Sequence, residues 1–580
     1  MEWYIISNMT PTRKGLTLAV FRLTHALFSH TASHLLSIAF LTVLIYSNSF
    51  SAPFHFDDVR FIVNNPVIRD FGNFNLPLNI RPFDITDSLL KTRYLGFLSF
   101  AMNFHLNDLH VFGYHLVNVA IHIANAFILY SLIILTFKTG NFRDFASDSS
   151  KYLIALFSAL IFACHPVQTQ AVTYIWQRVT ALATLFYLLA LLCYVMARLS
   201  AGSVKRPLLL LGALVAAVLA MKTKEIAFTL PFIVVTYEFV FFRGDARKRL
   251  FYIAPFLFTL LIIPLSLLRL DQPFQDFLAN VDGASRSMSG MPRSVFLLTE
   301  LRVMSTYLRL FFLPVNQNLD YDYPVFPDVP YRDVILSIFL ILILLSAATY
   351  ITARSRKTSP LLRLVAFGIF WFFITIATES SLIPIADVIF EHRLYLPSFG
   401  LIVALVSGIT YVYEMRYSQI KILLLAVFVG IFAVATYTRN AVWRDTITVW
   451  SDVVQKSPNK VRGHDNLGKA AIAKSDYATA ISHLQWVLSV APDDYIAHNN
   501  IGVAYKNSEM LENAVAHFRI ATGLKPDFVD AHFNLAISYL QMEEIKPSLA
   551  ELETTLQLDP AHPQAAQFIR YILSNYQSSP

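Results

Sequence analysis

The 580-residue chain is poor in charged residues and in cysteine. Only 15% of its residues are Asp, Glu, Lys or Arg, whereas about 25% is usual for soluble domains. A soluble protein of this length would fold into several domains, and their surfaces would need more charge. The low charge therefore excludes a purely soluble enzyme and a disordered scaffold. The two cysteines, Cys164 and Cys193, both lie in apolar runs, which excludes the disulfide framework of a small secreted domain.

Apolar residues take the place of charge. They make up 55% of the chain, and the mean hydropathy is +0.51. Stretches near the ~20 residues needed to cross a bilayer recur up to about residue 437 and then stop. The sequence predicts eleven spans, at about 33–50, 113–137, 151–165, 170–198, 207–221, 226–242, 250–270, 331–353, 361–378, 398–415 and 420–437. The first of them lacks a small-residue cleavage site, which favours a signal anchor.

Basic residues concentrate in alternate loops between these spans. The clearest groups are Arg243 to Arg249 after the sixth span and Arg354 to Arg363 after the eighth. By the positive-inside rule, the amino terminus is predicted in the cytoplasm and the carboxyl domain outside it. Residues 295–314 are apolar but carry Glu300, so they are interpreted as an amphipathic or re-entrant helix on the outer face. The net charge of +7 is modest, and no nucleic-acid partner is expected.

The carboxyl-terminal part of the chain is a repeat with a period of 34. Three sets of residues keep this step: Pro458, Pro492, Pro526 and Pro560; His464, His498 and His532; Asn466, Asn500 and Asn534. Small residues recur where two helices would touch, a pattern typical of tetratricopeptide repeats. The sequence predicts a membrane domain at 1–437, a linker helix at 438–460 and three repeats with a closing helix at 461–580. The three asparagines are predicted to bind an acceptor peptide, or to belong to the repeat framework.

Two adjacent acids, Asp57 and Asp58, follow the first predicted span. Carboxylates at a membrane boundary are expensive, which makes them candidates for function. A low-dielectric site raises the pKa of a carboxylate, and this suits a general base. The alternative is that both acids lie in solvent beyond the headgroups.

Cations and histidines gather at the predicted outer ends of later spans: Arg178, Lys222, Lys224, Arg393, His165 and His392. The loop with Lys222 and Lys224 breaks the positive-inside pattern, which indicates an anionic ligand such as a lipid phosphate. The alternative for any one of these cations is headgroup snorkelling.

Several segments, in the same order along nearly the whole chain, resemble the transmembrane and tetratricopeptide-repeat O-mannosyltransferase family. They are Phe56-Asp57-Asp58 with Asn64-Asn65-Pro66, Gly113 to Asn118 with His122, Cys164-His165-Pro166 with Arg178, Lys222-Thr223-Lys224-Glu225, Glu391 to Ser398, and Arg439-Asn440 with Trp443. Gln168-Thr169-Gln170 stands where eukaryotic members carry an acid, and three repeats are few. Both departures predict a bacterial relative in the inner membrane with a periplasmic repeat domain.

The resemblance implies an all-α membrane glycosyltransferase of the GT-C class followed by a tetratricopeptide solenoid. It implies a polyprenyl-phosphate sugar as donor and Ser or Thr hydroxyls of exported proteins as acceptors. Asp57 or Asp58 would be the base of a single inverting displacement, and the cations and histidines above would bind the donor phosphate. No cofactor is required by this chemistry, although the two acids are able to hold a divalent metal.

Besides an enzyme whose acceptor is a glycan or lipid in place of a protein, two other functions remain open on sequence alone. The first is a non-catalytic membrane platform that displays the repeats, although eleven spans exceed what an anchor needs. The second is a transporter or flippase, which usually carries polar residues near the midplane of the bilayer. His115, Asn118, His122 and Asn125 line one face of the second span. For them, hydrogen bonds between helices are favoured over substrate contact.

Overall fold

A computed structural model describes residues 31–74, 89–90, 92–142, 148–202, 204–267, 291–354, 359–380, 385, 387–413 and 418–576. Within these ranges the chain is helical and has no strand, so the predicted all-α class is confirmed. The chain divides into two compact units. Unit 1 comprises Met1–Gln317 with Tyr323–Arg444, and unit 2 comprises Asn318–Asp322 with Asp445–Pro580.

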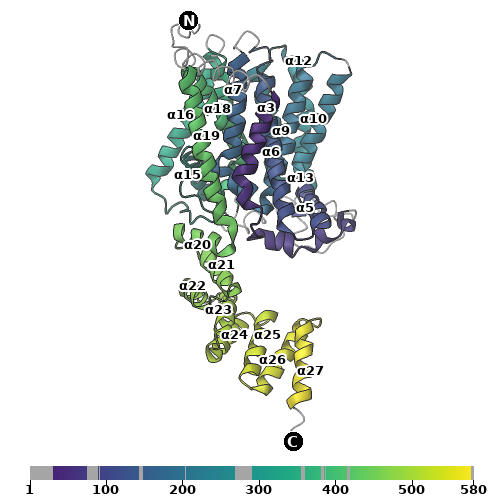
Figure 1. The fold of residues 1–580 in the computed structure, drawn as a ribbon, viewed down its shortest axis with the longest axis vertical. Helices are drawn as coiled ribbons and strands as arrows, with labels where there is room; N and C mark the ends of the chain where they lie inside the picture. The colour runs from purple at the N-terminus through teal and green to yellow at the C-terminus, as the bar shows by residue number, and fades with distance from the viewer. Residues whose placement is uncertain are drawn as a thin grey trace, which may run out of the picture. The chain divides into compact units, whose positions relative to one another are not determined.

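In unit 1, each predicted span coincides with a helix, and these helices run side by side in one bundle (Figure 1). They are α3 (Thr31–Tyr46), α6 (Val111–Thr136), α7 (Asp148–Cys164), α9 (Arg178–Leu199), α10 (Lys205–Met221), α11 (Leu230–Phe241), α12 (Ala246–Phe258) continued by α13 (Ile262–Leu267), α16 (Tyr331–Arg354), α17 (Leu361–Ile376), α18 (Tyr395–Val412) and α19 (Ser418–Asn440). By length and composition, seven helical stretches of the described chain are able to cross a membrane, or eight if the bent pair Ser150–Cys164 and Pro166–Val172 is one span. The helices α10, α11 and α17 are shorter.

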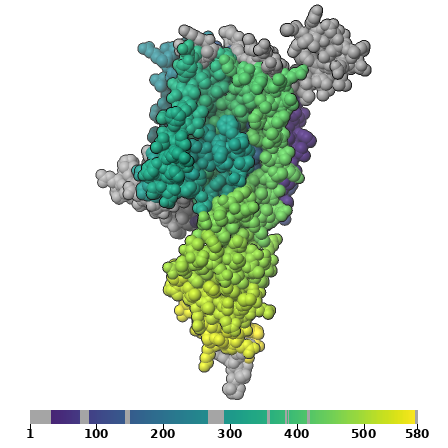
Figure 2. Space-filling model, turned by 90° about the vertical axis from the view of Figure 1, so that its left-hand side faces the viewer, coloured from purple at the N-terminus to yellow at the C-terminus, as the bar shows by residue number. Residues whose placement is uncertain are grey.

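The outer surface of the bundle is apolar. On α16, which lies on the face seen in Figure 2, Leu336, Phe339 and Ile343 are exposed. A soluble protein rarely exposes so continuous an apolar surface. Several apolar helices therefore indicate an integral membrane protein.

The helices pack closely where glycines face each other. A Cβ at Gly368 of α17 would collide with the carbonyl oxygen of Gly400 on α18, and the reverse substitution would meet Gly368. Small residues let two backbones approach in this way in membrane helix pairs. Beside this contact, the rings of Trp371 and Phe399 stack at 4.5 Å. The pair fixes α18, which directly follows residues Glu391–Leu394 of the candidate site.

Short helical turns collect at the end of the bundle where α3 finishes (Figure 1). After α3 come η1 (Ser47–Ser49), η2 (Val59–Val63), η3 (Pro66–Arg69), η4 (Phe71–Phe74) and α5 (Tyr94–Asn107). The turns η5 (Pro166–Gln168), α8 (Thr169–Val172), η6 (Ile175–Gln177), η7 (Glu225–Thr229) and η9 (Glu391–Leu394) precede or follow bundle helices. The described parts of the chain between α3 and α6 thus form short helical elements. The predicted amphipathic segment forms α15 (Arg293–Phe312) and is not among the candidate spans.

Unit 2 begins with α20 (Thr446–Lys456), which follows the turn η10 (Ala441–Arg444), and continues as three helix pairs and a closing helix. The pairs are α21 (Val461–Ala473) with α22 (Tyr477–Val490), α23 (Tyr495–Asn507) with α24 (Leu511–Leu524), and α25 (Val529–Gln541) with α26 (Ile545–Leu558), and α27 (Pro563–Tyr576) closes the array. The turn inside each pair has one left-handed residue at the 34-residue step: Ser475, Glu509 and Glu543, with φ of 61°, 64° and 61°. The predicted helix-pair solenoid is therefore present.

The periodic prolines and histidines have a structural role in unit 2. The ring nitrogen Nε2 of His464, His498 and His532 lies 2.9–3.0 Å from the carbonyl oxygen of the proline six residues earlier. Each bond closes the junction before a helix pair. Segment Asn318–Asp322 also joins this unit, because Asp320 accepts hydrogen bonds of 2.6 and 2.7 Å from the guanidinium of Arg462.

Candidate active site

The two predicted acids have different surroundings. Asp58 is fully buried, and its carboxylate accepts the N–H groups of His55 at 2.9 Å and of Trp176 at 2.6 Å. Burial raises the pKa of Asp58, and these two hydrogen bonds oppose that rise without cancelling it. Asp58 therefore joins the segment after α3 to the turn before α9.

Asp57 is only half-buried, and its N–H donates to the hydroxyl of Tyr174 at 3.0 Å. The preceding residue, Phe56, has φ of 47°, a left-handed conformation that is costly for an aromatic residue and often marks a functional site. This turn lets one acid enter the protein interior while its neighbour stays partly accessible. Of the two, Asp57 is placed better to meet a substrate.

Arg178, the first residue of α9, is fully buried and bonded to the protein. Its guanidinium donates to the side chains of Asn118 at 2.7 Å and Asn103 at 2.8 Å, and to backbone carbonyls of Ser99 and Tyr114. The positive charge of Arg178 lies close enough to Asp58 to oppose the rise in the pKa of that acid. The arrangement fixes the start of α9 against α5 and α6.

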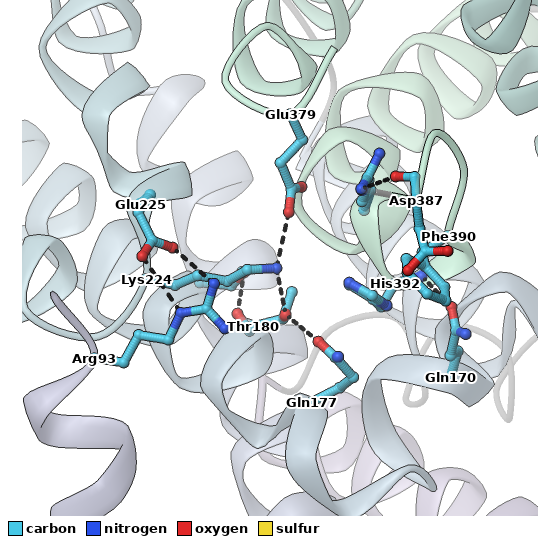
Figure 3. A network of polar contacts seen from close by, with 12 residues as sticks. Arg93, Gln170, Gln177, Thr180, Lys224, Glu225, Glu379, Asp387, Phe390 and His392 are labelled. Atoms are coloured by element: carbon cyan, nitrogen blue, oxygen red, sulfur yellow. Dashed lines mark hydrogen bonds and ion pairs between the residues drawn. The ribbon is translucent and has the colours of Figure 1, made fainter. Parts of the chain in front are cut away.

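Two residues later in α9, Thr180 opens a second polar network, drawn in Figure 3. The Lys224 amine donates to the Thr180 hydroxyl at 3.0 Å and pairs with Glu379 at 2.9 Å, while Thr180 donates to Gln177 at 2.9 Å. Burial lowers the pKa of Lys224, and the carboxylate of Glu379 opposes this. The segment Tyr174–Thr180 thus touches the acid pair on one side and the lysine network on the other.

A second ion pair borders this network. Arg93, just before α5, meets Glu225 with two contacts of 3.2 and 3.4 Å. Burial would raise the pKa of Glu225, but the Arg93 guanidinium, a backbone hydrogen bond and the charge of Lys224 together lower it to about 2. The pair therefore stays charged at neutral pH and ties α5 to η7.

The predicted residues of η9 complete the network. The N–H of His392 donates to the Gln170 side chain at 2.7 Å, and Arg393 donates to the carbonyls of Val388 at 2.9 Å and Asp387 at 2.6 Å. His392 and Arg393 are buried, and both lie within electrostatic reach of this network, His392 near Lys224 and Arg393 near Glu379. Figure 3 shows the side chains of Lys224, Glu379 and His392 turned toward a common centre.

The other two predicted ligands, Lys222 and His165, contact other parts of the bundle. The amine of Lys222 is half-buried and donates to the Ser266 hydroxyl at 2.5 Å. Burial lowers its pKa, and no ion pair to Lys222 is found among the described residues. His165 is fully buried and bonded to the Phe311 carbonyl at 2.8 Å, with its ring stacked on that of Phe311. His165 thus packs α15 against the end of α7.

The polar face of α6 is used between helices, as the sequence favoured. His115 bonds the carbonyl of Ala52, Asn118 reaches Val172 and Arg178, and Asn125 donates to Ala181. His122 lies 2.7 Å from the hydroxyl of Tyr395 on α18.

The repeat asparagines bond to neighbouring helices or to their own. Asn500 donates to Asp465 at 3.3 Å and Asn534 to Asn499 at 3.1 Å, each in the preceding repeat. Asn466 donates to the Arg462 carbonyl in its own helix. These contacts fit a framework role, and the predicted contact with an acceptor stays a prediction.

Three charged residues of the network were not predicted for the site: Arg93, Glu379 and the buried Glu300 of α15. Glu379 follows the apolar run of α17, so an acid at a span end was the signal that could have found it. Among the described residues, no group of three or more His, Cys, Asp or Glu side chains is arranged to hold a metal. The divalent metal considered at Asp57 and Asp58 stays an expectation.

The chain is similar to known proteins in both units. A tetratricopeptide repeat family model matches residues 495–528. Protein O-mannosyl-transferase F38B6.6 of Caenorhabditis elegans is 23% identical over 75% of this chain and 59% of its own length. Protein O-mannosyl-transferase Tmtc3 of Drosophila melanogaster is 26% identical over 79% and 55%. The chain spans about half the length of the curated relatives it matches.

Solved structures match with low scores over the superposed chain. YrrB, described as a TPR protein with an unusual peptide-binding site, is 16% identical, covers 39% of this chain and 99% of its own, and has a TM-score of 0.21. The bacterial origin predicted from sequence stays a prediction. The resemblance itself is confirmed, since the curated homologues of this chain over most of its length are TMTC-type protein O-mannosyltransferases and the chain carries a tetratricopeptide repeat.

Proposed function

We propose that the chain is an integral membrane glycosyltransferase that moves a monosaccharide from a polyprenyl phosphate to Ser or Thr hydroxyls of exported proteins. The mannose named for its relatives is the first sugar to test. One observation carries the proposal. The segment Tyr174–Thr180 contacts an accessible acid at one side and a buried cationic network at the other, which supports a base and phosphate-binding groups near one helix start.

In this proposal Asp57 is the general base. The acceptor oxygen attacks the anomeric carbon and its proton passes to Asp57. The bond from that carbon to the phosphate oxygen breaks, and the lipid phosphate leaves with the electron pair. One displacement inverts the anomeric centre, so a single base is sufficient, unlike in retaining hydrolases. Buried Asp58 holds the turn that positions Asp57.

The leaving phosphate gains negative charge as its bond breaks, so fixed cations stabilise the transition state more than the ground state. Lys222 is the best first contact, because its amine bonds only a hydroxyl among the described residues. Lys224 is paired with Glu379, so a phosphate at Lys224 would compete with that carboxylate. The guanidinium of Arg393 is held by two backbone carbonyls, and in this proposal it adds fixed positive charge to the site.

The repeats are proposed to hold the acceptor protein, on whose exposed segment the hydroxyl lies. The inside position of the amino terminus and the periplasmic position of the repeats remain part of this proposal. The test uses the full chain in proteoliposomes with polyprenyl-phosphate mannose and a Ser- or Thr-containing exported protein. Transfer of mannose that is absent in Asp57→Asn supports the proposal. If the intact chain transfers no sugar from any polyprenyl-phosphate donor, a non-catalytic platform is the better reading.

A further inference from the structure

A cluster of buried polar groups near the lysine network makes fewer hydrogen bonds than its polar atoms allow. Nε2 of Gln170 and Nδ1 of His392 are buried without a hydrogen-bond partner, and the buried carboxyl of Glu300 has only the hydroxyl of Ser380 beside it. Buried polar atoms are nearly always bonded, and each orphan costs about 1–3 kcal/mol. Several such orphans together indicate a place for a polar ligand.

These groups belong to one site. The hydroxyl of Ser380 faces the Glu300 carboxyl, and Glu300 also interacts electrostatically with Arg393 and Glu379. Glu379 is the carboxylate paired with Lys224 at 2.9 Å. Gln170 is fixed by its other amide atom, which accepts the N–H of His392 at 2.7 Å. Arg393, which also acts electrostatically on His392, links the Glu300–Ser380 pair to Gln170 and His392.

The chemistry of the four groups selects the ligand. They comprise a carboxyl, an amide donor, an imidazole nitrogen and a hydroxyl, a mixture that suits groups able both to donate and to accept. A phosphate offers only acceptors at neutral pH, and the acids Glu300 and Glu379 would repel it. A pyranose ring offers several neutral hydroxyls. The stacked rings of Phe390 and His392, at 5.1 Å, add an apolar surface beside them.

We propose that Glu300, Ser380, Gln170 and His392 form the subsite that binds the hydroxyl groups of the donor sugar and so select its identity. This inference rests on the proposed glycosyl transfer. It assigns His392 to the sugar, leaving the phosphate to the lysines. Burial raises the pKa of Glu300 to about 7, so near neutral pH the carboxyl is able to donate as well as accept.

The test compares donor analogues across variants of the full chain. Polyprenyl-phosphate mannose and a set of single-deoxy analogues, each lacking one hydroxyl, are assayed with the intact chain, Ser380→Ala, Gln170→Ala and Glu300→Gln. Thr410→Val is the matched control, because its buried hydroxyl bonds only the Val406 carbonyl of its own helix. Circular dichroism and Tm identify variants that fail to fold. If Glu300→Gln fails to fold, the Ser380→Ala and Gln170→Ala variants still decide the test.

For the intact chain and the control, loss of the recognised hydroxyl should lower kcat/KM about tenfold, as expected for one hydrogen bond. In the variant that lacks the side chain contacting this hydroxyl, the analogue and the full mannose donor should have the same kcat/KM. This coupling between the hydroxyl and the side chain is expected of a direct contact. If every variant lowers transfer from all donors by the same factor, the groups are only structural and the inference is wrong. If the intact chain transfers no sugar at all, the proposed function itself fails.

Discussion

The substitutions Asp57→Asn and Asp58→Asn should have opposite consequences for activity and stability. Asp58 is buried and accepts two backbone N–H groups, at 2.9 and 2.6 Å. The asparagine side chain keeps one acceptor oxygen, but its NH₂ group would face one of these two backbone N–H donors. Losing a hydrogen bond to a charged group costs about 1.5–3 kcal/mol. Burial already raises the pKa of Asp58, which means that a charged carboxylate is costly there. The neutral amide avoids that cost, so we expect the free energy of unfolding to fall by an amount near the lower end of this range, about 2 kcal/mol.

Asp57 lies half-buried, the bond of its N–H to Tyr174 is retained when the side chain changes, and an amide keeps an oxygen for the contact of the side chain with the Tyr174 hydroxyl. We therefore expect a change in stability within about 0.5 kcal/mol for Asp57→Asn. Removing a general base typically lowers a rate by about 10²–10⁴-fold, which corresponds to about 3–5 kcal/mol in the activation barrier. Transfer should thus nearly vanish while the fold is kept.

Both variants are measured for Tm in detergent and for initial rate of sugar transfer in proteoliposomes, at saturating donor. The expected result is a normal Tm with little transfer for Asp57→Asn, and a lowered Tm for Asp58→Asn. An Asp57→Asn protein with more than half the activity of the intact chain, together with an inactive Asp58→Asn protein of unchanged Tm, would refute the assignment.

Further outcomes test other parts of the molecule. Removing residues 455–580 should raise KM for the protein acceptor more than KM for the lipid donor, and an equal rise in both would assign the repeats a structural role. Gly502→Ala should lower the stability of the repeat unit by about 1–3 kcal/mol through overpacking, because a Cβ there would lie 2.6 Å from a ring carbon of the facing helix, whereas Gly523→Ala, with open space around it, should not. Burial raises the pKa of Glu300 from 4.5 to about 7, so the folded protein holds a proton that the unfolded chain has released. The contribution of Glu300 to stability is therefore full below pH 4.5 and is lost as the pH rises to about 7, and Glu300→Gln should remove this part of the pH dependence of Tm between pH 5 and 7.

The repeat unit was predictable because its structure is local and periodic. Prolines and histidines equivalent to Pro492 and His498 each recur every 34 residues, and this step sets the length of one helix pair. The same step separates the left-handed turns at Ser475 and Glu509. The bundle helices were predictable for a similar reason, since each needs a continuous apolar stretch. The predicted start of the fourth span at about residue 170 was too early, because the short elements α8 and η6 precede α9, which begins at Arg178.

The partners within the site could not be read from the sequence. Lys224 and Glu379 are far apart in the chain, and only the packing of α17 against neighbouring helices brings them to 2.9 Å. Likewise, nothing local distinguishes Asp57 from Asp58. The difference arises because the N–H of Trp176, more than a hundred residues later, captures one carboxylate. Pairings of this kind depend on tertiary packing, which a single sequence does not specify.

The most direct measurement is the intact mass of exported proteins from cells that carry the chain, cells from which it is deleted, and deleted cells that express Asp57→Asn. The account predicts that one or more exported proteins lose a monosaccharide increment on Ser or Thr upon deletion. The intact chain should restore it and Asp57→Asn should not. Identical masses in all three strains, with the chain expressed and inserted, would contradict the claim that this protein transfers sugar.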